Sequence, residues 1–132
     1  MKTLLALSLF AFSTFALACP ESAQLKNYNA CVNVQWNYGP YINQYNEILV
    51  TLDAIDPTRP IQNDEIKIFP WMIMNHHEHG SRPVVQTKLR DNEYKVEKIY
   101  FMGGMQGTWQ IRIQHLNAGK VIEEVRHNVL FQ

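Results

Sequence analysis

Hydrophobic and polar residues alternate along much of this chain, which is the pattern of β-strands that bury one face. In one run Ile48, Val50 and Leu52 fall on the same face. A later run repeats the alternation over residues 109–114, beginning with Trp109. The apolar faces of these runs are expected to form the core.

Seven such runs are expected to be strands, because turn-forming residues separate them. The expected strands cover residues 31–37, 47–53, 65–69, 84–89, 94–101, 108–115 and 121–129. Residues 21–29 would form a short helix or an arm. About seven short strands are typical of an immunoglobulin-like sandwich. The predicted fold class is therefore all-β, an immunoglobulin-like β-sandwich.

The first eighteen residues have the layout of a cleaved secretory signal peptide, with Lys2, an apolar run and a small-x-small ending at 16–18. Residues 19–132 would then form a single domain, periplasmic or secreted. No later apolar run is long enough to span a bilayer, so no membrane span is expected in the mature chain.

Cys19 directly follows the predicted cleavage site, and Cys31 is the other cysteine of the chain. Cys19 could carry the lipid anchor of a bacterial lipoprotein. It could instead pair with Cys31 in an oxidising compartment. Two cysteines do not decide between these alternatives.

Charge is balanced, with twelve basic and twelve acidic residues, and no basic run stands out. Nucleic acid and anionic membrane surfaces are therefore not expected as partners. The acidic pairs Asp64-Glu65 and Glu123-Glu124 are expected to decorate strand edges. No His-Glu-x-x-His helix, nucleophile elbow or glycine-rich phosphate loop is present, so the chain is not expected to be an enzyme.

If consecutive strands run up and down, the connections after the first, third and fifth expected strands emerge at the same end of the sandwich. These connections are residues 38–46, 71–83 and 102–107. The segment WMIMNHHEHG at residues 71–80 is thus expected to meet FMGGMQG at residues 101–107.

These two segments hold every methionine that remains once the predicted signal is removed, together with three of the five histidines. Thioether sulfur is a soft ligand that favours Cu(I), and imidazole binds copper in either oxidation state. The sequence therefore predicts a copper site, most simply for Cu(I). The predicted ligands are Met72, Met74, Met105 and His79, with Met102, His76 and His77 as further candidates. The indole of Trp71, adjacent to Met72, would shield the ion.

Other interpretations of the same residues stay open. Two methionines at a strand end can belong to the core, and a group of histidines can be solvated surface. The expected convergence of the two segments favours a metal site over these two roles. The aromatic and methionine-rich end could instead dock a peptide or another envelope protein without any metal. A third interpretation uses His77 and His79 in a zinc or Cu(II) enzyme, although a catalytic zinc site needs a third protein ligand and an open position.

Several elements resemble the YtkA-like and FixH-like domains. The resemblance covers residues 32–125 and rests on Met72 and Met74 before the His79-Gly80 pair, then a Met-x-Gly-x-Trp element that begins at Met105. Those domains are small extracytoplasmic immunoglobulin-like sandwiches linked to copper handling and cytochrome oxidase maturation. The YtkA-like periplasmic form fits better, because FixH proteins usually carry a membrane-spanning segment. The resemblance implies a Cu(I) chaperone or sequestration protein, with the copper ion and a copper-accepting or copper-donating envelope protein as partners.

Overall fold

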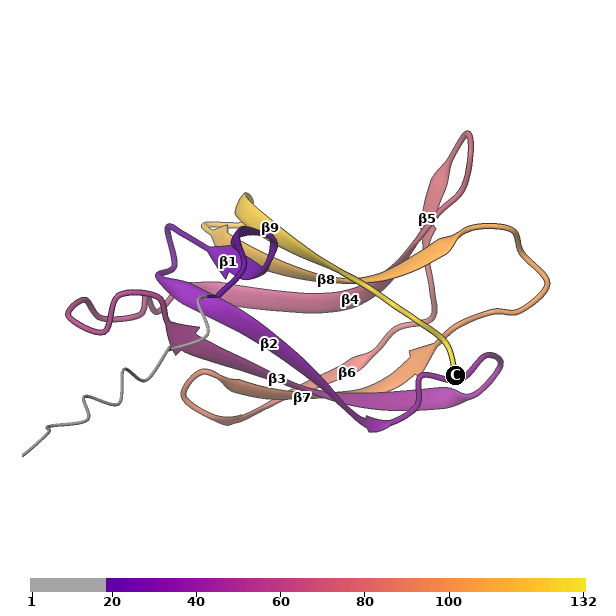
Figure 1. Ribbon diagram of the computed structural model, residues 1–132, viewed down its shortest axis with the longest axis horizontal. Coiled ribbons are helices and arrows are strands. Elements are labelled where there is room, and N and C mark those ends of the chain that lie inside the picture. The colour runs from indigo at the N-terminus through magenta and orange to yellow at the C-terminus, as the bar shows by residue number, and fades with distance from the viewer. Residues whose placement is uncertain (1–18) are drawn as a thin grey trace, which may run out of the picture.

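The computed structural model describes residues 19–132, so the predicted signal peptide lies outside the described part of the chain. Two antiparallel sheets pack face to face (Figure 1). One has the strand order β1-β2-β3-β7-β6 and the other β5-β4-β8-β9. The predicted all-β sandwich is confirmed. The elements are a short 3-10 helix Glu21–Ala23, β1 Gln24–Leu25, β2 Ala30–Tyr38, β3 Tyr45–Ala54, β4 Glu65–Ile73, β5 Glu78–Gly80, β6 Val85–Arg90, β7 Glu93–Tyr100, β8 Thr108–Asn117 and β9 Lys120–Asn128.

The alternating faces identified in the sequence form the core. Ile48 and Val50 of β3 are fully buried, as are Ile111 and Ile113 of β8. They belong to one cluster that fills the space between the two sheets. The period-two pattern thus predicts which face of each long strand is buried.

All seven expected strands are present, but β4 is longer than predicted. It continues past residue 69 to Ile73, so the first three residues of WMIMNHHEHG belong to a strand. Pro70 does not interrupt it. The backbone N–H of Ile68 donates to Gln86 and therefore points away from β8. Backbone N–H groups two residues apart point to the same edge of a strand, so the nitrogen of Pro70 also points away from β8. The missing N–H of Pro70 therefore costs no hydrogen bond to β8.

Cys19 and Cys31 form a disulfide, which is the second of the two alternatives for Cys19. The bridge lies beside the β1–β2 pair, in which Gln24 is opposite Cys31. In this structure the thiol of Cys19 is not free. The disulfide joins the start of the described chain to the first long strand.

His115 holds together several segments at the end of the sandwich that lies near β1. Its side chain is only 3% exposed, with Nε2 2.7 Å from Asp64 Oδ2 and Nδ1 2.9 Å from Glu123 Oε2. Glu123 also accepts the backbone N–H groups of Asn27 and Tyr28, at 3.0 and 2.8 Å. Glu123 lies on the edge strand β9, as predicted, and in addition it and Asp64 each have a buried histidine as a partner, which was not predicted from the sequence.

Candidate functional site

The three connections predicted to meet do lie at one end of the sandwich, on the right of Figure 1. Ile42 forms a bridge with Phe101, and the backbone N–H of Gly103 donates to Asn43 Oδ1 at 2.8 Å. Gly107 lies against the side chains of Met72 and Met74. We call this end, formed by residues 38–46, 71–83 and 101–109, the methionine end.

A cross-strand row of three side chains lies at its centre. Met72 of β4 is paired with His79 of β5 on one side and with Trp109 of β8 on the other. Residues directly opposite each other in an antiparallel sheet share a face. The rings of His79 and Trp109 lie edge to face, with centroids 6.3 Å apart, although Met72 separates their strands. The two rings therefore lean toward each other across Met72, which is 0% exposed.

The imidazole of His79 has one nitrogen fixed and one without a partner. Nδ1 lies 2.8 Å from the carbonyl oxygen of Gly80, and because a carbonyl only accepts, Nδ1 carries a proton. In the neutral ring Nε2 then holds a lone pair. Nε2 is buried and makes no hydrogen bond within residues 19–132. Metal-binding histidines commonly hold their other N–H against a carbonyl in this way. His79 is thus oriented as a nitrogen donor.

Met74 joins this row through Gly107. Met74 is the first residue after β4, two positions beyond Met72, and its backbone N–H donates to the carbonyl oxygen of His77 at 2.9 Å. A Cβ atom at Gly107 would lie 2.8 Å from Met72 Cε, 3.2 Å from Met74 Cγ and 2.7 Å from the carbonyl oxygen of Ile73. The absence of a side chain at Gly107 therefore allows two thioether side chains to converge on the start of β8.

The other predicted ligands also lie at the methionine end. Met102 is half-buried and packs against the core, and Met105 is 39% exposed on the loop before β8. His76 and His77 are exposed at the turn between β4 and β5, which projects from the sandwich in Figure 1. The ring of His77 stacks on that of His79, with centroids 6.2 Å apart. The structure thus pairs Met72 with His79 and places Met72 and Met74 at the same glycine, while the other four candidates lie elsewhere at the methionine end.

The role predicted for Trp71 is wrong. Successive residues of a strand point to opposite faces, so Trp71 lies on the outer face of the sheet while Met72 points inward. Its ring packs edge to face on Phe69, with centroids 5.9 Å apart, and its indole N–H donates to Glu78 at 3.1 Å. Trp109 is the tryptophan beside Met72. The Met-x-Gly-x-Trp element of the sequence contains Trp109 and could have pointed to a role at this site. Its alternation with Ile111 indicated only a core residue.

Within residues 19–132, no three side chains of histidine, cysteine, aspartate or glutamate gather closely enough to hold a metal ion. A metal ion bound by His79 would therefore need other ligands, and methionine sulfur is present at this end. The described part of the chain also contains no helix long and apolar enough to cross a membrane.

Comparison of the chain with protein-family models, with curated proteins and with solved structures finds no match.

Proposed function

We propose that this protein is an extracytoplasmic copper-binding protein that holds Cu(I) at the methionine end and either sequesters it or passes it to a partner protein. The observation that carries this proposal is the buried, unpartnered Nε2 of His79 beside the buried side chain of Met72. An unpaired buried polar atom costs about 1–3 kcal/mol. A bound metal ion would replace the missing partner.

The chemistry of the donors selects the ion. Sulfur from Met72 and Met74 with nitrogen from His79 is a soft, mixed ligand set of the kind that favours Cu(I). Met105 lies on the adjacent loop and would supply a further thioether, with Met102, His76 and His77 as reserve ligands. Thioethers carry no proton, so such a site depends less on pH than a thiolate site does. Trp109 adds an aromatic face that attracts a cation.

Three further features support an extracytoplasmic location. The Cys19–Cys31 disulfide is of the type that persists in oxidising compartments. The apolar leader and the resemblance to YtkA-like domains agree with it. A site built where loops meet also suits transfer, because a partner can replace the ligands one at a time.

A Cu(I) titration of residues 19–132 in competition with a chromophoric chelator tests the proposal. We expect one tight site, and we expect the double variant Met72→Leu with Met74→Leu to bind at least about a hundredfold more weakly, since it loses both sulfurs. Leucine nearly preserves side-chain volume, so the cost to stability should stay below about 1.5 kcal/mol per site. The free energy of unfolding of each variant provides the control. Unchanged affinity in a folded double variant would reject these ligands.

A second candidate function, docking of a protein without metal, is favoured by a different observation. Among residues 19–132, six of the ten exposed large apolar side chains lie at or next to the methionine end: Tyr38, Ile42, Tyr45, Met105, Leu130 and Phe131. The ring of Phe131 is 5.1 Å from that of Phe101, which brings the C-terminal residues to this end. Exposed apolar patches mark interaction surfaces. Elemental analysis of protein purified from copper-supplemented cells separates the two functions, because a docking module alone would be metal-free.

A further inference from the structure

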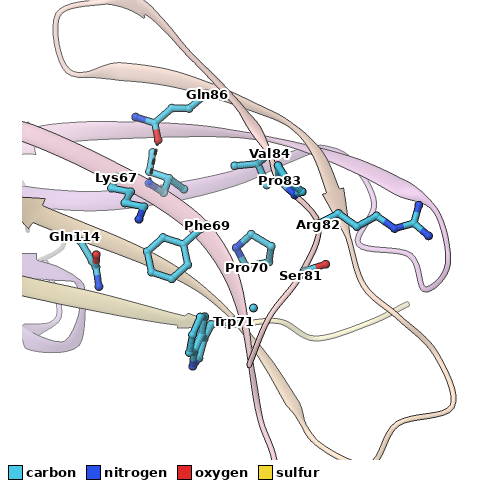
Figure 2. A pocket seen from close by; sticks show the side chains of 12 residues that line it. Lys67, Phe69, Pro70, Trp71, Ser81, Arg82, Pro83, Val84, Gln86 and Gln114 are labelled. Atoms are coloured by element: carbon cyan, nitrogen blue, oxygen red, sulfur yellow. Dashed lines mark hydrogen bonds between the residues drawn. The ribbon is translucent and has the colours of Figure 1, made fainter. Parts of the chain in front are cut away.

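A groove of about 600 Å³ lies between β4 and the segment that follows β5, and Trp71 and residues 80–83 of its lining belong to the methionine end (Figure 2). One wall is β4 with Phe69, Pro70 and Trp71, and the other is the segment 81–84 that leads from β5 to β6. Figure 2 shows Phe69 and Trp71 on one side of β4, with Arg82, Pro83 and Val84 on the neighbouring segment. Most of the lining is apolar or aromatic, so the groove suits an occupant with apolar side chains.

The edge of β4 that borders the groove is closed to another strand. β5 pairs only with residues 71–73, which leaves the earlier residues of β4 without a neighbouring strand on that side. The side-chain amide of Gln86 occupies this edge: it accepts the N–H of Ile68 at 2.9 Å and donates to the carbonyl oxygen of Ile66 at 2.8 Å. Pro70 has no N–H to offer. An occupant would therefore be held by side-chain contacts and not by strand addition.

The charges of the groove are unbalanced. Among the lysines and arginines of residues 19–132, four have no carboxylate within 4.0 Å: Lys67, Arg82, Lys98 and Lys120. Two of these four, Lys67 and Arg82, line the groove, and none of the described lining residues is acidic. The carboxylate of Glu78 contacts Trp71 but also lies 3.7 Å from Arg112 Nη2, so a cation outside the lining balances it.

Both unpaired cations are held by aromatic rings. Lys67 Nζ lies 5.2 Å from the centroid of the Phe69 ring, and Arg82 Cζ lies 3.9 Å from that of Tyr100. Cation–π contacts position these charges without neutralising them. The groove therefore combines an apolar, aromatic floor with one positive charge, Lys67, beside Phe69. A second charge, Arg82, lies at its rim, where the guanidinium packs on Tyr100 and points away from β4 (Figure 2).

We propose that this groove binds an extended, acidic, proline-containing segment of a partner protein. A polyproline II segment has no need of hydrogen bonds from a neighbouring strand, which matches the closed edge of β4. Such segments dock in aromatic-lined grooves, which matches Phe69 and Trp71. Acidic side chains in the segment complement Lys67 and Arg82. This proposal does not rest on copper binding.

The test uses metal-free residues 19–132 and a short synthetic peptide that alternates proline with leucine and carries glutamate near both ends. Two-dimensional NMR should show chemical-shift changes at Phe69, Val84 and the Trp71 indole. The variant Lys67→Glu with Arg82→Glu should weaken binding at least about tenfold. The matched control, Lys98→Glu with Lys120→Glu, makes the same change of net charge outside the groove and should leave the affinity within about twofold.

Three results would overturn the proposal: no shift changes in the groove, an equal loss of affinity in the control variant, or equal binding of a peptide with lysine in place of glutamate. The groove variant should retain the Cu(I) affinity of the wild type. Failure of the peptide experiment can therefore be distinguished from failure of the copper proposal.

Discussion

At the scale of single residues, one hydrogen bond distinguishes His79 from the other histidines of the methionine end. Three histidines lie within four positions, and their residue types do not distinguish them. Nδ1 of His79 donates to Gly80, and this leaves Nε2 buried beside Met72 with a lone pair. The side chains of His76 and His77 remain exposed. The sequence could not make this choice, because the choice depends on the pairing of β5 with β4.

We expect His79→Gln to weaken Cu(I) binding at least about tenfold, because the variant loses the imidazole donor. The fold should tolerate the change, since Nε2 has no partner to lose within the described residues. His127→Gln provides the matched control: His127 is half-buried on β9, opposite Ile111 and outside the row of Met72. Chelator competition gives the affinities and thermal unfolding gives the stabilities. An equal effect of the two substitutions would contradict the assignment of His79.

At the scale of elements, alternation predicts the long strands well because each has one buried face. It predicts the end of β4 poorly. Whether β4 tolerates Pro70, and where β5 pairs with it, depends on which edge of β4 faces a neighbouring strand. A local hydrophobic pattern does not contain that information. The predicted role of Trp71 failed for the same reason. A loop, as expected for residues 71–83, would allow Trp71 and Met72 to point to the same site, whereas a strand places them on opposite faces.

The strands near β1 provide a test of stability that is separate from the methionine end. We expect His115→Phe to lower the free energy of unfolding by about 1–3 kcal/mol, because the partly buried Glu123 loses its imidazole partner and keeps only its backbone hydrogen bonds. Chemical denaturation at neutral pH measures this loss. A loss below about 1 kcal/mol would show that His115 contributes little to holding these segments together.

The same variant has a predicted pH signature. The hydrogen bond from His115 lowers the pKa of Asp64 below its ordinary value of 3.8. A lowered folded-state pKa contributes stability that is present above the unfolded-state pKa and is lost as the pH falls through the folded-state value. Wild-type protein should therefore lose stability below about pH 4, and His115→Phe should lose less over the same range. Identical acid dependence in the two proteins would contradict this role of His115.

At the scale of the whole molecule, up-and-down connectivity explains why segments some thirty residues apart form one end. The order of strands alone predicts that residues 71–83 and 102–107 meet, because alternate connections emerge at the same end of a sandwich. The groove beside β4 could not be predicted from the sequence, because its walls come from segments that the fold brings together. Its charge pattern depends on which lysines and arginines have a carboxylate partner, and the sequence alone does not show these pairs.

The central claim is that Cu(I) binds thioether sulfur together with one imidazole, and X-ray absorption at the copper edge of Cu(I)-loaded residues 19–132 tests it most directly. Both cysteines are in the disulfide, so any sulfur bound to copper must come from methionine. We predict one copper per chain, with at least two sulfur neighbours and one nitrogen neighbour, and loss of the nitrogen contribution in His79→Gln. Protein that retains no copper, or a spectrum that contains only nitrogen and oxygen neighbours, would contradict the account.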